Sequence, residues 1–293
     1  MSKSALIIGS SSMLGQRLHE YLDKTGFKVF SCGRSDDDDI HYDLKDLALP
    51  HIPVGMKADI IFHCAATFSD DSLAGCLDNE KTNALSSYII NELATAIGCK
   101  HLIYAGTISS CYSHHSSSMT SYGASKLRGE DILEWSLSRN KIAFTSLRFP
   151  QLYDEYGICC KHQLWLGRII AYAFAGKNLR MPGGNAKRNF LHVDDAIQLM
   201  CAAMEKTTTG RLATTHFESI TYERIAQQAY DIFDNKGAHE LAPEKQPFRE
   251  IFIPESSETY KLLNYWPKIL MNDGIKMIKL AGSAQKFGPM DVT

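Results

Sequence analysis

The residues best suited to chemistry are Tyr122 and Lys126, which lie four positions apart in the segment Tyr122-Gly-Ala-Ser-Lys126. On a helix this spacing places both side chains on one face, so that the lysine cation lies near the phenol. A phenol with a pKa of about 10 is a poor base at neutral pH, but a nearby cation stabilises the phenolate. The pair can therefore remove a proton from an alcohol. Because such pairs arise by chance about once in a chain of this composition, the context decides their meaning.

A second candidate site is the turn Gly9-Ser-Ser-Ser-Met-Leu-Gly15 near the N-terminus. It follows the apolar run 5–8, typical of a buried parallel strand, and precedes a helical pattern that ends at Gly26. In such a strand-turn-helix unit the glycines allow a sharp turn and close packing, and the helix N-terminus binds a pyrophosphate. Ser12 stands where dinucleotide-binding turns usually have a third glycine. A serine-capped helix start without a ligand is therefore the alternative interpretation.

The elements that must position these residues alternate along the chain. Strands are expected at 28–32, 59–66, 102–107 and 143–147, and helices at 85–97 and 122–139. This alternation predicts an α/β fold of the Rossmann type, a doubly wound parallel sheet with ligands outside the carboxyl ends of its strands. We expect residues 1–150 to form the dinucleotide-binding domain with the catalytic residues. Residues 151–293, with helices at 164–175, 195–205 and 221–233, should form mainly a smaller C-terminal substrate-binding lobe, from which some segments can return to the sheet.

Composition and charge exclude several classes of function. The chain has 293 residues, of which 44% are hydrophobic and 22% charged, and its net charge of −2 gives no sign of a nucleic-acid partner. The longest apolar runs are too short to span a bilayer, and the first strand begins where a signal peptide would lie. The eight cysteines are scattered without paired metal-ligand spacing. We therefore expect a cytoplasmic protein with reduced thiols, no bound metal and no membrane partner.

In order and spacing these motifs resemble the extended short-chain dehydrogenase/reductases, the NAD-dependent epimerase/dehydratase family that modifies nucleotide sugars. The resemblance extends to Asp43-Leu44, to Asn83 at the expected start of the next helix, and to the segment from Arg188 to Asp195. It implies that Tyr122 is the catalytic acid/base and that Lys126 also binds the nicotinamide ribose. It further implies a homodimer formed through helices near 83–97 and 122–139.

Together, the motifs and the resemblance predict Thr107, Tyr122 and Lys126 as catalytic residues. They also predict a set of substrate contacts and a set of cofactor contacts, which include these three. Thr107 takes the place of the family's catalytic Ser or Thr at the end of its strand, and Ser109 is the alternative. The predicted substrate contacts are Thr67, Thr107, Ser109, Gln151 and Arg188. The predicted cofactor contacts are Gly9, Ser11, Ser12, Met13, Leu14, Gly15, Arg34, Asp43, Leu44, Cys64, Ala65, Ala66, Asn83, Tyr122, Lys126 and Phe149.

The choice of cofactor depends on the residues that follow the second strand. An acidic side chain there binds the ribose 2′-OH of NAD, whereas an arginine accommodates the 2′-phosphate of NADP. Arg34 stands at this point with no acid at the strand end, which favours NADP. The run Asp36-Asp37-Asp38-Asp39 favours NAD unless its carboxylates point into solvent, which is the interpretation preferred from the sequence.

The reaction is narrowed but not fixed by the sequence. A 4,6-dehydratase is disfavoured, because those enzymes have Thr-Asp-Glu where this chain has Thr107-Ile-Ser109. A 4-keto-sugar reductase and an epimerase both remain, with Arg188 expected to bind the diphosphate of a nucleotide sugar. The alternatives are a surface arginine paired with an aspartate at that position, a reductase of a small carbonyl compound, or a non-catalytic NAD(P)-binding sensor on the same fold.

Overall fold

The computed structural model describes residues 3–113 and 116–290 and comprises two compact units. The first unit contains residues 1–149, 197–214 and 254–265, and the second contains 150–196, 215–253 and 266–293. The chain thus leaves the first unit after Phe149 and returns to it twice. Each unit is described by itself.

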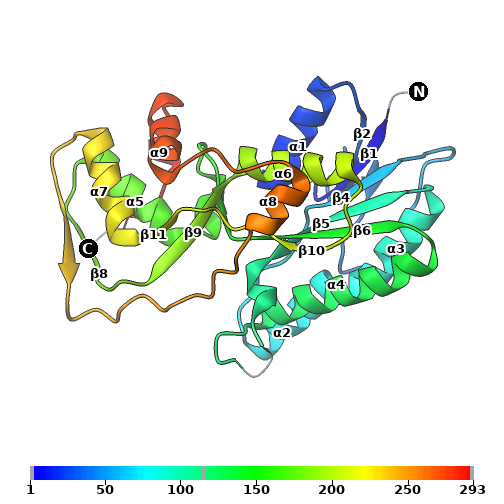
Figure 1. The fold of residues 1–293 in the computed structure, drawn as a ribbon, viewed down its shortest axis with the longest axis horizontal. Helices are drawn as coiled ribbons and strands as arrows, with labels where there is room; N and C mark the ends of the chain where they lie inside the picture. The colour runs from blue at the N-terminus through cyan, green and yellow to red at the C-terminus, as the bar shows by residue number, and fades with distance from the viewer. Residues whose placement is uncertain (1–2, 114–115, 291–293) are drawn as a thin grey trace. The chain divides into compact units, whose positions relative to one another are not determined.

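A seven-stranded sheet forms the centre of the first unit (Figure 1). Its order is β10-β6-β5-β4-β1-β2-β3, and every pairing is parallel. The winding direction reverses between β1 and β4, which is where doubly wound sheets bind their ligands. The predicted α/β fold class is confirmed. The strands are β1 Ser4–Ile8, β2 Lys28–Gly33, β3 Ile40–His41, β4 Ile60–His63, β5 His101–Thr107, β6 Ala143–Phe149 and β10 Gly210–Ala213.

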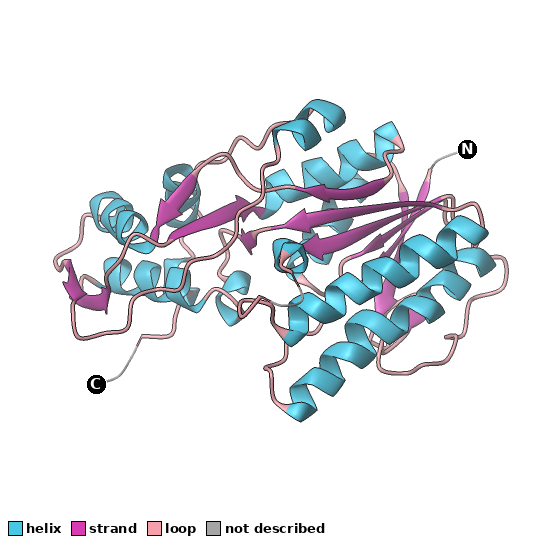
Figure 2. Ribbon diagram, turned by 60° about the horizontal axis from the view of Figure 1, so that its bottom comes forward, coloured by secondary structure: helices cyan, strands magenta, loops and turns pink. Residues whose placement is uncertain are grey.

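Helices cover both faces of this sheet (Figure 2). Helix α1 lies on one side, and α3 and α4 lie together on the other (Figure 1). Helix α6 runs from the second unit into the first. The helical segments are α1 Met13–Lys24, α2 Leu73–Asn79, the π-helical η1 Glu80–Leu85, α3 Ser86–Ala96, the 3₁₀ turn η2 Ile108–Cys111, α4 Ser121–Arg139, α6 Val193–Lys206 and α8 Ser257–Leu263.

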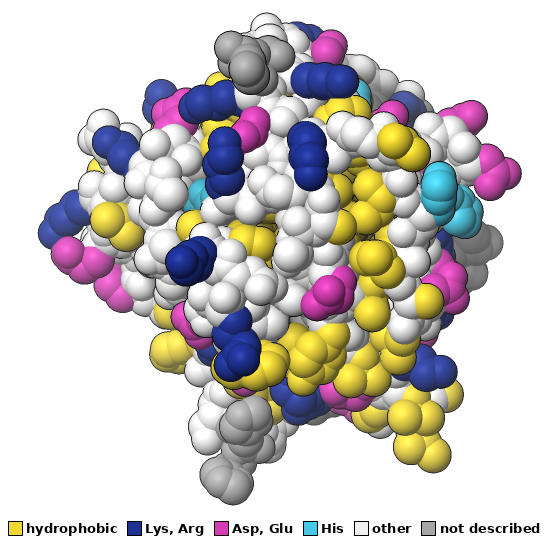
Figure 3. All heavy atoms as spheres, turned by 90° about the vertical axis from the view of Figure 1, so that its right-hand side faces the viewer, with side chains coloured by type: hydrophobic (Ala, Val, Ile, Leu, Met, Phe, Trp, Pro, Cys, Tyr) yellow, Lys and Arg dark blue, Asp and Glu magenta, His cyan; other side chains and the backbone are white. Residues whose placement is uncertain are grey.

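The surface carries no sign of a membrane span or of one dominant charge. No helix in the described part of the chain combines the length and the apolar character that crossing a bilayer requires. On the face drawn in Figure 3, basic and acidic side chains are interspersed among hydrophobic ones.

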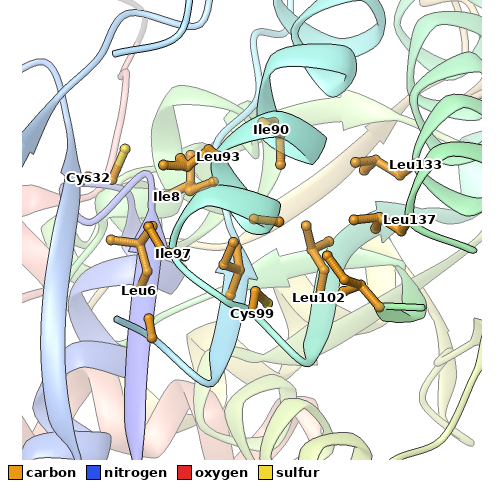
Figure 4. Packing of buried hydrophobic residues seen from close by; sticks show 14 of the residues in the cluster. Leu6, Ile8, Cys32, Ile90, Leu93, Ile97, Cys99, Leu102, Leu133 and Leu137 are labelled. Carbon is orange, nitrogen blue, oxygen red and sulfur yellow. The ribbon is translucent and has the colours of Figure 1, made fainter. Parts of the chain in front are cut away.

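The core on one side of the sheet packs strand residues against α3 and α4 (Figure 4). Aliphatic side chains repeat at helical spacing on α3 and α4, and they meet alternate residues of β1, β4 and β5. Burying each such side chain stabilises the fold by roughly 1.5–3 kcal/mol, which gives helix α4 a rigid base. Members that are at most 1% exposed include Leu6, Ile8, Ile61, Ile90, Leu93, Ile97, Leu102, Leu133 and Leu137.

The second unit is built from short strands and three helices besides the start of α6. Strand β9 pairs with β7 in parallel and with β11 in antiparallel fashion, and β8 pairs with β12. The helices predicted at 164–175, 195–205 and 221–233 are confirmed. The elements are β7 Gln151–Tyr153, α5 Leu164–Ala175, β8 Leu179–Pro182, β9 Lys187–His192, β11 Ser219–Thr221, α7 Tyr222–Phe233, β12 His239–Ala242 and α9 Met271–Leu280, with 3₁₀ turns at 158–161 and 284–286.

One helix begins earlier than the sequence predicts. Asn83 does not start a helix but lies inside a helical stretch that begins at Leu73, because η1 and α3 continue α2 without a break. In α2 the hydrophobic residues are not the buried ones: Leu73 and Leu77 are 78% and 55% exposed, whereas Gly75 and Asn79 are buried. Periodicity alone therefore could not identify this helix.

Candidate active site

The glycine turn lies at the point where the winding of the sheet reverses. Gly9 has a φ of +85°, and a Cβ there would lie 2.7 Å from the backbone nitrogen of Ala65 at the end of β4. A Cβ on Gly15 would lie 2.1 Å from the Gly9 carbonyl oxygen, so both positions need glycine. Ser12 caps α1, with its Oγ accepting from the Gly15 N–H at 3.0 Å. Ser12 therefore caps the helix within a tight glycine turn, so the capped helix start and the turn are both present.

The loop after β4 is held in place by two asparagines. The Asn83 side chain accepts from the Thr67 N–H at 2.9 Å and donates to the Thr67 carbonyl at 3.0 Å and to Ser125 Oγ at 3.1 Å. One turn earlier, Asn79 bonds the Ser69 backbone in the same way and donates to Ser121 Oγ at 2.8 Å. Asn83 is 2% exposed, so the structure gives this predicted cofactor contact a role in positioning the loop.

Thr107 and Tyr122 meet at the carboxyl edge of the sheet. Thr107 is the last residue of β5 and is 8% exposed, and its side chain lies close enough to the phenol of Tyr122 to lower the pKa of that phenol. Tyr122 lies in the first turn of α4, whose N-cap Thr120 accepts from the Gly123 N–H at 3.2 Å. Ser109 donates its backbone N–H to Thr107 Oγ1 at 3.2 Å. Of the two candidate hydroxyls, that of Thr107 is therefore the one that lowers the pKa of the phenol.

Lys126 is buried rather than solvated. It is 1% exposed, and its Nζ lies 3.8 Å from the centroid of the Tyr104 ring on β5. Burial lowers the pKa of Lys126 to about 7, while the nearby Glu130 carboxylate opposes this shift. Burial also raises the pKa of Tyr122 to about 12, and the hydrogen bond with Thr107 opposes that rise. A lysine that changes charge near neutral pH, one helical turn along α4 from the Tyr122 phenol, is suited to support proton transfer.

A buried ion pair behind these residues was not predicted from the sequence. Glu130, one helical turn after Lys126, is fully buried and accepts from Arg148 Nε at 3.1 Å and Nη2 at 2.5 Å. Ser146 Oγ donates to the same carboxylate at 2.5 Å. The available signal was a set of polar residues within the otherwise apolar strand β6. This network ties α4 to the strand beside Thr107.

The remaining predicted cofactor contacts of the first unit differ in exposure. Burial raises the pKa of the Cys64 thiol to about 12, so this half-buried cysteine is a poor nucleophile. Leu14, Leu44 and Phe149 are buried; Ser12, Met13, Asp43, Cys64 and Ala65 are half-buried; and Ser11, Arg34 and Ala66 are exposed.

In the second unit, Arg188 lies among aromatic side chains. It is 7% exposed, and its guanidinium carbon lies 5.2 Å from the Tyr222 ring centroid and 5.6 Å from that of Phe248. Gln151 donates to Tyr222 Oη at 3.4 Å. Arg188 is therefore no solvated surface residue. The structure brings Gln151 and Arg188 together around Tyr222, a residue that sequence reasoning missed, as it also missed Phe248.

Two further sets of side chains in the described part of the chain are the cysteines and the residue types that bind metals. All eight cysteines are free. Within residues 3–113 and 116–290, no group of three or more His, Cys, Asp or Glu side chains could hold a metal ion.

Solved structures with the same fold include several nucleotide-sugar enzymes. UDP-N-acetylglucosamine 4-epimerase from Bacillus cereus is 22% identical, with a TM-score of 0.80 over 96% of this chain and 99% of that one. UDP-glucose 4-epimerase from Thermotoga maritima, solved with UDP-glucose, is 19% identical, with a TM-score of 0.76 over 96% and 99%. MoeE5, solved with UDP-glucuronic acid and NAD, is 17% identical, with a TM-score of 0.78 over 95% and 99%.

At these identities the likeness establishes the fold. Among curated proteins, no sequence matches this chain. A family model, however, matches residues 5–215, which include the glycine turn, the catalytic candidates and Arg188. The chain therefore belongs to the NAD dependent epimerase/dehydratase family of enzymes.

Proposed function

We propose that this enzyme transfers hydride on a nucleoside-diphosphate sugar, by epimerisation or by reduction of a 4-keto-sugar, with Tyr122 as acid/base. The observation that carries the proposal is the placement of Thr107 and Tyr122 at the carboxyl edge of the sheet that holds the Gly9 turn, with a buried Lys126 one helical turn further along α4. A sensor that only binds a dinucleotide needs neither the buried lysine Lys126 nor the phenol of Tyr122 beside Thr107.

The residues present fit a nicotinamide dinucleotide. The Gly9 turn and the N-terminus of α1 suit its pyrophosphate, because Gly9 and Gly15 lack the side chains that would crowd the turn. When bound, the oxidised ring accepts a hydride and adds a positive charge to the site. Tyr122 as phenolate takes the proton of the sugar hydroxyl, and protonated Lys126 stabilises that phenolate. The Thr107 hydroxyl holds the substrate oxygen in line with the phenol.

The cluster around Arg188 supports a nucleotide-sugar substrate. An arginine fork binds diphosphate oxygens through two parallel hydrogen bonds, and stacking on Tyr222 and Phe248 fixes its plane. The UDP-glucose and UDP-glucuronic acid in two of the similar structures make UDP-sugars the first candidates. Arg188→Ala is expected to raise KM far more than it lowers kcat, because the contact acts in binding.

We also propose a cytoplasmic homodimer. The free state of every cysteine supports a reducing compartment. Exposed apolar side chains on η1, α3 and α4 support pairing through these helices: Leu85, Tyr88 and Trp135 are 41%, 47% and 58% exposed. A monomer in light scattering at micromolar concentration contradicts the dimer.

The test of the proposed reaction uses purified protein, both nicotinamide dinucleotides, and a panel of UDP-sugars and their 4-keto forms, with products identified by NMR. Tyr122→Phe should lower turnover by roughly 10²- to 10⁴-fold and leave cofactor affinity nearly unchanged, since it removes only the proton-transfer group. The control is Tyr21→Phe on α1, which should keep wild-type turnover. Near-normal turnover in Tyr122→Phe refutes the assignment. Cofactor binding without turnover of any sugar in the wild type favours a sensor or a reductase of small carbonyl compounds.

A further inference from the structure

The acidic loop between β2 and β3 folds back onto the glycine turn. Asp38 Oδ1 accepts from Ser10 Oγ at 2.6 Å, and its Oδ2 accepts from the Ser35 N–H at 3.0 Å. Asp39 Oδ2 accepts from the N–H and Oγ of Ser31 at 2.8 and 3.0 Å. The second half of the aspartate run is therefore bound to the tip of β2, whereas Asp36 and Asp37 are exposed.

This arrangement places one carboxylate between the turn and the end of β2. Ser10 directly follows Gly9, and Gly33 is the last residue of β2. A Cβ on Gly33 would lie only 2.7 Å from Asp38 Oδ2, so the missing side chain of Gly33 makes room for the Asp38 carboxylate. Asp38 is half-buried, so it still presents an edge to a ligand. The carboxylate that dinucleotide-binding units carry at the strand end is supplied here from the loop five residues further on.

We infer that Asp38 makes this protein select NAD over NADP. The inference rests on the proposed function, since it concerns the cofactor of that same site. A ribose 2′-OH can donate a hydrogen bond to the carboxylate, whereas a 2′-phosphate brings a charge of about −1.5 to −2 to the same place. A 2′-phosphate next to the Asp38 carboxylate is repelled, because both groups are negatively charged. The carboxylate accepts hydrogen bonds from Ser10 and Ser35, so it cannot move away without losing both.

The charges around the adenosine end favour the same choice. Arg34, on which the prediction of NADP rests, is exposed, so water and salt screen its attraction for a phosphate. The other charged groups of the loop are Asp36, Asp37 and Asp39, with His41 Nδ1 lying 3.7 Å from Asp36. The loop between β2 and β3 itself thus carries four carboxylates and one arginine, and this balance disfavours an added dianion.

The test is isothermal calorimetry of the full chain with NAD⁺ and with NADP⁺. For the wild type, NAD⁺ should bind at least about tenfold more tightly, a difference of about 1.4 kcal/mol. Asp38→Asn, which removes the charge but keeps the shape, should narrow that ratio by about tenfold, chiefly through tighter NADP⁺ binding. The matched control is Asp37→Asn, which removes the same charge from an exposed neighbour and should leave the ratio unchanged.

Three results separate this inference from the proposed function. Tighter binding of NADP⁺ by the wild type overturns the role of Asp38 while leaving the proposed reaction intact. An equal effect of Asp37→Asn and Asp38→Asn overturns it as well, because the selection then depends on total loop charge. If the folded wild type, checked by circular dichroism, binds neither dinucleotide, the proposed function itself fails.

Discussion

Replacing Lys126 by methionine should change how the stability of the protein depends on pH. Burial lowers the pKa of Lys126 from 10.5 in its ordinary state to about 7 in the folded protein. The unfolded chain therefore binds this proton more tightly than the folded chain does. Stability should be lowest below the folded pKa, rise as the pH increases between the two values, and level off above the unfolded pKa.

The size of this effect follows from the shift. A difference of about 3.5 pKa units corresponds to about 5 kcal/mol of opposition to folding when the lysine is charged in both states. Between about pH 7 and about pH 9 the wild type should regain roughly 2 kcal/mol of that amount. Lys126→Met has no proton to lose, so its stability relative to the wild type should fall by the same 2 kcal/mol across this range.

Urea denaturation at a series of pH values measures the difference. The control is Lys24→Met, which removes an exposed lysine from the last turn of α1 and should follow the wild-type curve. A constant difference between the wild type and Lys126→Met over this range refutes the reasoning, because Lys126 would then not change its charge there.

Three further substitutions test other parts of the site. Glu130→Gln should lower the free energy of unfolding by about 3–5 kcal/mol in urea denaturation, because the Arg148 side chain, which is only 15% exposed, stays charged and loses its partner. Its control, Asp131→Asn, breaks a surface ion pair and should lower the same free energy by at most about 1 kcal/mol. Ser12→Gly should cost only a few tenths of a kcal/mol and keep or improve cofactor affinity in calorimetry, and loss of binding would show that the hydroxyl is itself a ligand. Asn83→Ala should cost roughly 2–4 kcal/mol, because three hydrogen bonds are removed from a buried site, and an unchanged melting curve would contradict its role.

The parts of the site that the sequence predicts are those fixed by local geometry. The spacing of Tyr122 and Lys126 on one helix face, and the glycines of the turn, follow from backbone geometry that any such unit shares. The burial of Lys126 was not predictable, since it depends on how helix α4 packs against Tyr104 of strand β5.

The parts that sequence reasoning missed depend on loop conformation or on distant segments. The sequence predicts a solvated Asp38, because nothing in the acidic run indicates that it bonds Ser10, 28 positions earlier. The stacking of Phe248 on Arg188 joins residues from separate segments, so no local pattern reveals it. Periodicity describes the sheet and its long helices well, but side-chain bonds between elements need the fold itself.

The side chains of Asn79 and Asn83 connect the loop after β4 to the start of α4, so that the two segments are held together. Asn79 and Asn83 bond the loop at Ser69 and Thr67, and they bond α4 at Ser121 and Ser125, the residues that flank Tyr122. The ordering of these segments is thus completed during folding, and an incoming dinucleotide meets a surface that is already assembled. A surface that is ordered before binding loses little conformational entropy when the ligand binds, which raises affinity. Engineering the loop for another ligand therefore requires changes in α4 and in the helical stretch that carries the two asparagines.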